Sequence, residues 1–110
     1  MQTYRTDDLV ERRAASGQAY LEFQRSADLS TGLYVLPAGG VDHQQPHTED
    51  EVYVAIAGRG TITVGDEEAP VGPGSVVFVP AGMPHRFHDI AEELRLLVVF
   101  GPAEGSRAGR

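Results

Sequence analysis

A histidine and a glutamate stand close together at the start of an apolar segment. His47 lies four residues before Glu51, and Gln45 precedes His47 by two residues. Imidazole nitrogens and carboxylate or amide oxygens are all ligand types for divalent metals. In an extended chain Gln45 and His47 point to the same face, and Pro46 disfavours helical geometry at Gln45. The stretch is therefore either a solvated loop with an incidental histidine or one half of a metal site.

A second histidine follows a turn further along the chain. The segment PAGMP at 80–84 ends one apolar stretch and leads directly into His85. If the two parts of the chain lie on facing sheets, four polar side chains can converge inside a barrel: Gln45, His47, Glu51 and His85.

Other polar residues near these positions are expected elsewhere in the fold than among the four converging side chains. Glu49 and Asp50 are predicted to lie in a solvated turn. Tyr53 is expected either in the wall of a cavity or in the core. His43 is interpreted as a loop or rim residue, and His88 as a surface residue that faces away from the interior of the barrel.

The elements that must position the site are strand-like. Breaks rich in glycine and proline separate runs with strand character at 19–26, 31–37, 51–57, 61–64, 69–71, 75–79, 85–90 and 94–100. The break GRG at 58–60 is interpreted as a turn. Many short strands with little helical periodicity predict an all-β antiparallel sandwich or barrel.

The two ends of the chain differ from this pattern. Residues 1–18 are predicted to form an N-terminal arm with a short helix, capped by Thr6 or Asp7 and ended by Gly17. Residues 19–101 then form a single domain, which suits a chain of 110 residues. The small and polar segment 102–110 is predicted to be a flexible tail.

Composition excludes several classes of function. The formal net charge of −7 argues against nucleic acid as a partner, because an acidic surface repels phosphates. No apolar run approaches the roughly 20 residues that span a bilayer, so no membrane partner is expected. The chain has no cysteine, which excludes thiolate nucleophiles, disulfides and cysteine metal sites. Its polar N-terminus does not look like a signal peptide, and cytoplasmic residence is predicted.

Taken together, two motifs resemble those of the cupin superfamily, over about residues 31–100. The first motif reads Gly39, Gln45-Pro46-His47, Glu51 and Gly58, with Gln45 where the family usually has its first histidine. The second motif reads Gly74, Pro80-Ala81-Gly82, His85 and Asp89, with aspartate in place of the usual final asparagine. The chain is thus similar to small single-domain cupins.

The resemblance implies a jelly-roll barrel, or double-stranded β-helix, with one divalent metal ion in it. Carried over by position, the metal ligands are Gln45, His47, Glu51 and His85. Two histidines and one carboxylate suit Fe(II) with open positions and also other divalent ions, so Fe, Mn, Zn, Ni and Co all stay open. Gln45 is either a weak fourth ligand or a donor behind the ligands. The alternative is a cupin barrel that has lost its metal.

Two functions are compatible with such a site. The first is a metal-dependent enzyme of the dioxygenase, isomerase or lyase type, acting on a small organic molecule. The second is a non-catalytic cupin that binds or senses a small ligand, with or without metal. A homodimer is also predicted, because Leu21, Phe23, Leu33 and Val35 carry more apolar surface than so short a chain can easily bury.

Overall fold

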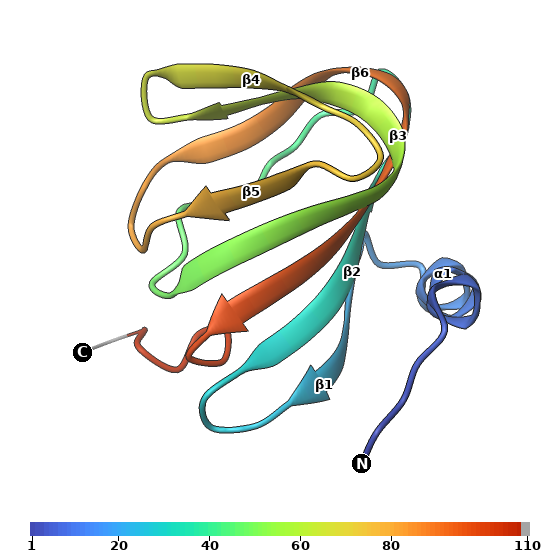
Figure 1. Ribbon diagram of the computed structural model, residues 1–110, viewed down its shortest axis with the longest axis vertical. Coiled ribbons are helices and arrows are strands. Elements are labelled where there is room, and N and C mark those ends of the chain that lie inside the picture. The colour runs from blue at the N-terminus through green and yellow to red at the C-terminus, as the bar shows by residue number, and fades with distance from the viewer. Residues whose placement is uncertain (109–110) are drawn as a thin grey trace.

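The computed structural model, which describes residues 1–108, is built almost entirely from strands (Figure 1). One helix precedes them. In chain order the elements are α1 (Thr6–Ser16), β1 (Tyr20–Arg25), β2 (Ser30–Leu36), β3 (Asp50–Val64), β4 (Glu67–Val71), β5 (Val76–Val79) and β6 (His85–Gly101). The predicted all-β class with a short N-terminal helix is confirmed.

The strands form one antiparallel sheet that folds over itself. Its order is β1-β2-β6-β3-β4, and β5 pairs with β3 beside this path. The long strands β3 and β6 bend through both layers, so their two halves line opposite walls of the barrel (Figure 1). Within residues 1–108 the hydrogen-bonded path does not close between β1 and β4. The barrel is therefore a bent sheet whose inner face encloses the core.

The predicted turn at 58–60 is wrong, because β3 continues through it. The pairing of β3 with β6 shifts register three times between Ala55 and Thr61, and these irregularities bend the strand. Gly58 has a φ of 91°, and a Cβ there would lie 1.9 Å from the carbonyl oxygen of Glu93. Glycine is required at this position because the two backbones approach so closely. The predicted strands 85–90 and 94–100 are likewise one strand, β6.

Alternation along β3 and β6 sorts side chains between the core and the outer face. Tyr53, Phe87, Leu94 and Leu96 belong to the main core and are at most 1% exposed. Glu51 has the same orientation as Tyr53 on β3, two positions away. Because side chains alternate along β3, the carboxylate of Glu51 points into the interior, as Tyr53 does.

Helix α1 covers part of the outer face. Leu9 is 2% exposed and packs with Leu33 and Val35 of β2 in a second, smaller core. Gly17 ends the helix with a φ of 72°, as predicted. The predicted cap by Thr6 or Asp7 is wrong, because both residues lie within the helix: Arg5 precedes it, and no side chain caps it there. The helix thus buries the apolar surface of β2 from which the sequence predicted a dimer.

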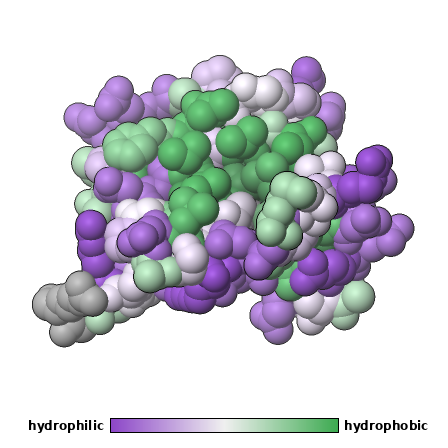
Figure 2. Space-filling view, turned by 60° about the horizontal axis from the view of Figure 1, so that its bottom comes forward, coloured by the Kyte–Doolittle hydropathy of each residue, from purple (hydrophilic) through white to green (hydrophobic). Residues whose placement is uncertain are grey.

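A different part of the outer face stays open. Val52 of β3 pairs with Phe78 of β5 on one side and with Val99 of β6 on the other, and Val54 pairs with Val76 in the next row. Phe78 is 59% and Val76 67% exposed. Figure 2 shows hydrophobic residues gathered over the middle of one face of the molecule. We use the name outer apolar face for five residues: Val52, Val54, Val76, Phe78 and Val99.

The C-terminal segment, residues 102–108, folds back onto the barrel. Ala103 is 3% exposed, and the backbone N–H of Glu104 donates to Ser30 Oγ over 2.9 Å. The prediction of a flexible tail is therefore wrong for this segment, because buried backbone partners hold it. Residues 109–110 of that predicted tail lie outside the described residues. No helix in the described part of the chain is long and apolar enough to cross a membrane.

Candidate metal centre

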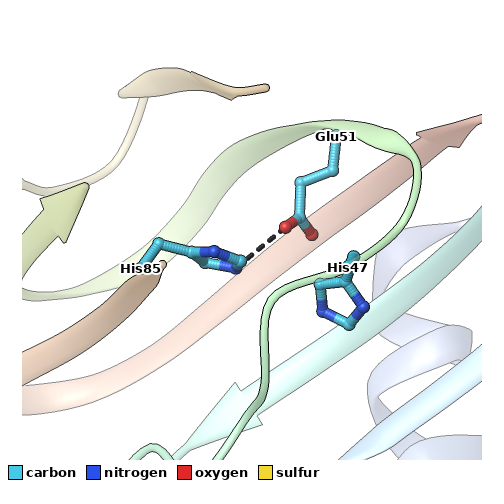
Figure 3. Close-up of side chains that lie close together, drawn as sticks. All are labelled: His47, Glu51 and His85. Atoms are coloured by element: carbon cyan, nitrogen blue, oxygen red, sulfur yellow. Dashed lines mark ion pairs between the residues drawn. The ribbon is translucent and has the colours of Figure 1, made fainter. Parts of the chain in front are cut away.

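Three of the four predicted site residues meet inside the barrel. His47, Glu51 and His85 each offer a ligand atom within 4.8 Å of the others. Glu51 lies near the start of β3 and His85 is the first residue of β6, whereas His47 belongs to the loop before β3 (Figure 3). The site therefore joins two strand ends that the fold holds rigidly and one residue of a loop.

Glu51 occupies the centre of the group. Its side chain is 1% exposed, and Oε1 lies 2.9 Å from Nε2 of His85. The other oxygen, Oε2, is buried and has no hydrogen-bond partner among the described residues. A buried carboxylate oxygen without a partner is costly. A bound cation would satisfy this oxygen, so the donor set fits a metal ion.

Hydrogen bonding fixes the orientation of His85. Its Nδ1 lies 2.9 Å from the carbonyl oxygen of Met83. A carbonyl only accepts, so Nδ1 carries a proton and Nε2 faces Glu51 and the hydroxyl of Tyr53, 3.0 Å away. This arrangement is the one usual for metal-binding histidines. Burial lowers the pKa of His85, but the bonds to Glu51 and Met83 outweigh it and raise the pKa above its usual value.

Gln44 supplies a polar link that the sequence did not predict. Its Oε1 accepts from the Tyr53 hydroxyl over 3.0 Å and lies 3.2 Å from Nε2 of His47. Its amide nitrogen donates to the carboxylate of Asp42 over 2.7 Å. Asp42 is 7% exposed and also accepts from Tyr34. These bonds orient the Gln44 oxygen toward the site.

Gln45 is not brought to the other three residues. It is exposed and does not line the cavity, whereas Gln44 does. The expectation assumed an extended chain from Gln45 to His47, but no strand forms between β2 and β3. The loop turns the earlier of two adjacent glutamines inward. His43 also lines the cavity although it is exposed, which agrees with its interpretation as a rim residue.

His47 and Glu51 line a cavity of about 330 Å³, whereas His85 contacts Glu51 but does not line the cavity. Tyr53 lines the cavity and is also part of the core, so both expectations for it hold. Aliphatic and aromatic side chains form most of the wall, with the polar groups gathered near His47. The residues that line it are Ala19, Tyr20, Tyr34, Val35, Leu36, Pro37, Val41, His43, Gln44, His47, Glu51, Tyr53, Val98, Phe100 and Glu104.

Glu49 is not in a solvated turn, as its acidic neighbours suggested. It is 2% exposed, and its carboxylate accepts from the backbone N–H groups of Gly105 over 2.7 Å and Arg107 over 3.0 Å. The hydroxyl of Thr48 donates to it as well. Burial raises the pKa of Glu49, but these hydrogen bonds outweigh it and lower the pKa below its usual value. This carboxylate is a buried anchor for the C-terminal segment.

A second group of possible ligands lies on the surface. Glu68, His88 and Asp89 also place ligand atoms within 4.8 Å of one another. His88 is bonded to Thr63 over 2.7 Å and to Asp89 over 2.9 Å. The side chains of Glu68 and Asp89 are 61% and 80% exposed, so water satisfies their oxygens.

Comparison with known proteins points to one family. The family model for the cupin domain matches residues 32–100. The chain is 54% identical over 104 residues to uncharacterized protein SCO3923 of Streptomyces coelicolor, a match that covers 94% of this chain and 99% of that protein. The crystal structure of TT1209 from Thermus thermophilus superimposes with a TM-score of 0.76 and 33% identity, over 94% of this chain and 99% of the other.

A more distant relative has a named activity. Acireductone dioxygenase 2 of Arabidopsis thaliana is 29% identical over 90 residues. The match covers 76% of this chain but 47% of that protein.

Proposed function

Because its match over residues 32–100 makes the chain a member of the cupin domain family, we propose that it binds a divalent metal ion and uses it on a small organic molecule. The proposed ligands are His47, Glu51 and His85. The observation that carries the proposal is the buried oxygen Oε2 of Glu51, which has no partner in the described chain and belongs to a carboxylate grouped with two histidines. Gln44 takes the place beside His47 that was predicted for Gln45.

The charge of the ligand set suits Lewis-acid chemistry. Two neutral histidines and one carboxylate contribute one negative charge, so a divalent ion would keep a net positive charge and open positions. Such an ion would polarise a substrate oxygen or stabilise negative charge that develops on it. Fe, Mn, Zn, Ni and Co all remain candidates, because nitrogen and oxygen ligands bind each of them.

The cavity would hold the organic molecule beside the ion. Leu36, Val98 and Phe100 offer an apolar wall, which would exclude water and hold a carbon skeleton. The hydroxyl of Tyr34 is already bonded to Asp42 over 2.7 Å and keeps that side of the cavity fixed. A volume of about 330 Å³ suits a small metabolite.

The reaction we favour is a dioxygenase reaction, with isomerase and lyase reactions as alternatives. The ligand types are those of Fe(II) oxygenases, and one relative is named acireductone dioxygenase 2. The matched region covers 47% of that relative, so its substrate is not transferred to this chain.

A non-catalytic binding cupin is the second candidate. The contact of 2.9 Å between His85 and Glu51 favours it, because the two ligands partly satisfy each other without a metal. Binding of a small molecule to the apolar wall would then need no ion.

Metal titration of the purified protein tests the metal site on which the first candidate depends. After treatment with a chelator, Mn(II), Fe(II), Co(II), Ni(II) and Zn(II) are added singly, and bound metal and the melting temperature are measured. We expect one ion per chain and, at about 100 times its Kd, a rise in melting temperature of roughly 10 °C. A protein that binds none of the five ions and melts unchanged would refute the metal site and leave the binding cupin.

We also propose that two copies of the chain pair through the outer apolar face. Val76 and Phe78 lie on β5, whose one pairing partner in the described residues is β3, so the exposed edge and the apolar surface adjoin. Phe78→Asp should shift a dimer to a monomer of 11.8 kDa in light scattering. Exposed Val41 offers a matched control, since Val41→Asp should leave the dimer intact. A wild-type protein that is monomeric at high concentration would contradict this proposal.

A further inference from the structure

The C-terminal segment brings a second carboxylate to the candidate metal centre. Oε2 of Glu104 lies 3.5 Å from Nδ1 of His47, and Glu104 lines the same cavity. Its side chain is 33% exposed, so it sits at the rim and not in the interior. Neither cupin motif includes this residue, because it follows the last strand.

The backbone of Glu104 is held on both sides. Its N–H donates to Ser30 Oγ over 2.9 Å, and the guanidinium of Arg25 donates to its carbonyl oxygen. Ser30 is fully buried. One residue further on, the N–H of Gly105 donates to the buried carboxylate of Glu49. These contacts fix where the side chain of Glu104 starts, so its position beside His47 is built into the fold.

The two nitrogens of His47 have different surroundings. Nδ1 faces the Glu104 carboxylate, and Nε2 lies 3.2 Å from the Gln44 oxygen. That oxygen also accepts from Tyr53, whose hydroxyl lies 3.0 Å from Nε2 of His85. Nε2 of His47 is therefore the nitrogen on the side of His85, and Nδ1 is the nitrogen on the side of the C-terminal segment.

We propose that Glu104 is a positioning residue for His47: when a metal ion takes the place of the Nε2 proton that faces Gln44, Glu104 accepts the Nδ1 proton and thereby keeps Nε2 directed to the metal. This inference rests on the proposed metal site. A carboxylate behind a histidine ligand fixes the ring orientation and raises the basicity of the binding nitrogen. His47 needs such support more than His85 does. His85 begins a strand and is bonded to the Met83 carbonyl, whereas His47 lies in a loop.

The inference is tested with the full chain in which Glu104→Gln removes the charge and keeps the shape. Affinity for Zn(II) is measured in competition with a chromogenic chelator. We expect a loss of about 10- to 100-fold, the range found when a carboxylate behind a ligand histidine is removed. Glu11→Gln is the matched control, because it makes the same change on the exposed face of α1 and should not alter affinity. Glu104→Asp, which keeps the carboxylate, should recover part of the affinity.

A spectroscopic measurement separates positioning from a structural effect. In the Zn(II)-loaded protein, long-range 1H–15N NMR should show a protonated Nδ1 and a metal-bound Nε2 in His47. Glu104→Gln should shift the Nδ1 resonance of His47 and leave that of His85 in place. Equal Zn(II) affinity and an unchanged His47 spectrum in Glu104→Gln would overturn this inference while the metal site stands. A wild-type protein without Zn(II) affinity would overturn both.

Discussion

The molecule contains two groups of histidine and carboxylate with similar spacing and different surroundings. In the inner group, the side chains of Glu51 and His85 are each 1% exposed. In the surface group, Glu68 is 61% and Asp89 80% exposed. Water can satisfy the surface carboxylates, whereas Oε2 of Glu51 has no partner in the described chain. Burial without a partner, and not the presence of ligand types alone, therefore distinguishes a candidate metal centre from a solvated cluster.

The largest expected effect comes from removing the charge at the centre of the inner group. Glu51→Gln should abolish metal binding, because the amide is a weak neutral donor and the set loses its negative charge. The loss should exceed the roughly 10- to 100-fold expected for residues behind the ligands. Metal content by mass spectrometry measures it. Glu68→Gln makes the same change in the surface group and should retain a full complement of metal; equal losses in both variants would contradict the distinction.

Removing a histidine from the inner group should lower the free energy of unfolding more than removing one from the surface group. His85→Ala leaves the buried Glu51 carboxylate unpaired, and breaking a buried pair in this way costs roughly 3 kcal/mol. His88→Ala removes partly exposed bonds and should cost about 1 kcal/mol or less. Urea unfolding of the metal-free proteins gives both values. A larger loss for His88→Ala would place the critical polar group on the surface instead.

A smaller effect on Zn(II) affinity should show which of the two adjacent glutamines supports the inner group. Gln44→Ala removes the oxygen shared by Tyr53 and His47 and should weaken Zn(II) binding by about 10-fold. Gln45→Ala is the neighbouring control and should bind Zn(II) as the wild type does, since Gln45 is exposed. The reverse result in a chelator competition would restore the expectation from sequence.

A still smaller effect is expected at Tyr53, which joins the candidate metal centre to the core. Tyr53→Phe removes the hydroxyl that bonds to Gln44 and lies beside His85, and it keeps the ring. The free energy of unfolding should fall by about 1 kcal/mol. Tyr34→Phe removes a comparable bond to Asp42 and is the matched variant. An unchanged unfolding midpoint in Tyr53→Phe would show that this bond does not support the site.

The sequence predicted the parts of the site that strands position. Glu51 and His85 lie where strand alternation turns side chains inward, and a period of two is readable from the residues. The loop residues of the site were harder to predict, because a loop has no repeating pattern that shows which side chains point inward. Gln44 and Gln45 are adjacent residues of the same type, so the sequence does not distinguish them. Glu104 and Glu49 carry no local signal, since His47 and Gly105, their respective partners, are far away in the sequence and the segment after Gly101 was predicted to be a tail.

The fold shows the same division. The all-β class and the helix were predicted from patterns within each segment. The continuity of β3 through Gly58 was not, because a glycine that permits a close approach of backbones looks the same in sequence as a glycine in a turn. The outer apolar face also escaped notice, since it depends on which strands become neighbours of β5.

Anomalous scattering from a crystal of the metal-loaded protein tests the proposed metal centre most directly. Data collected on both sides of the absorption edge of the bound ion locate it without reference to the chain. We predict a single strong peak per chain within coordination distance of His47, Glu51 and His85. A peak at Glu68, His88 and Asp89 with none in the cavity, or no peak in either place, would contradict the proposal.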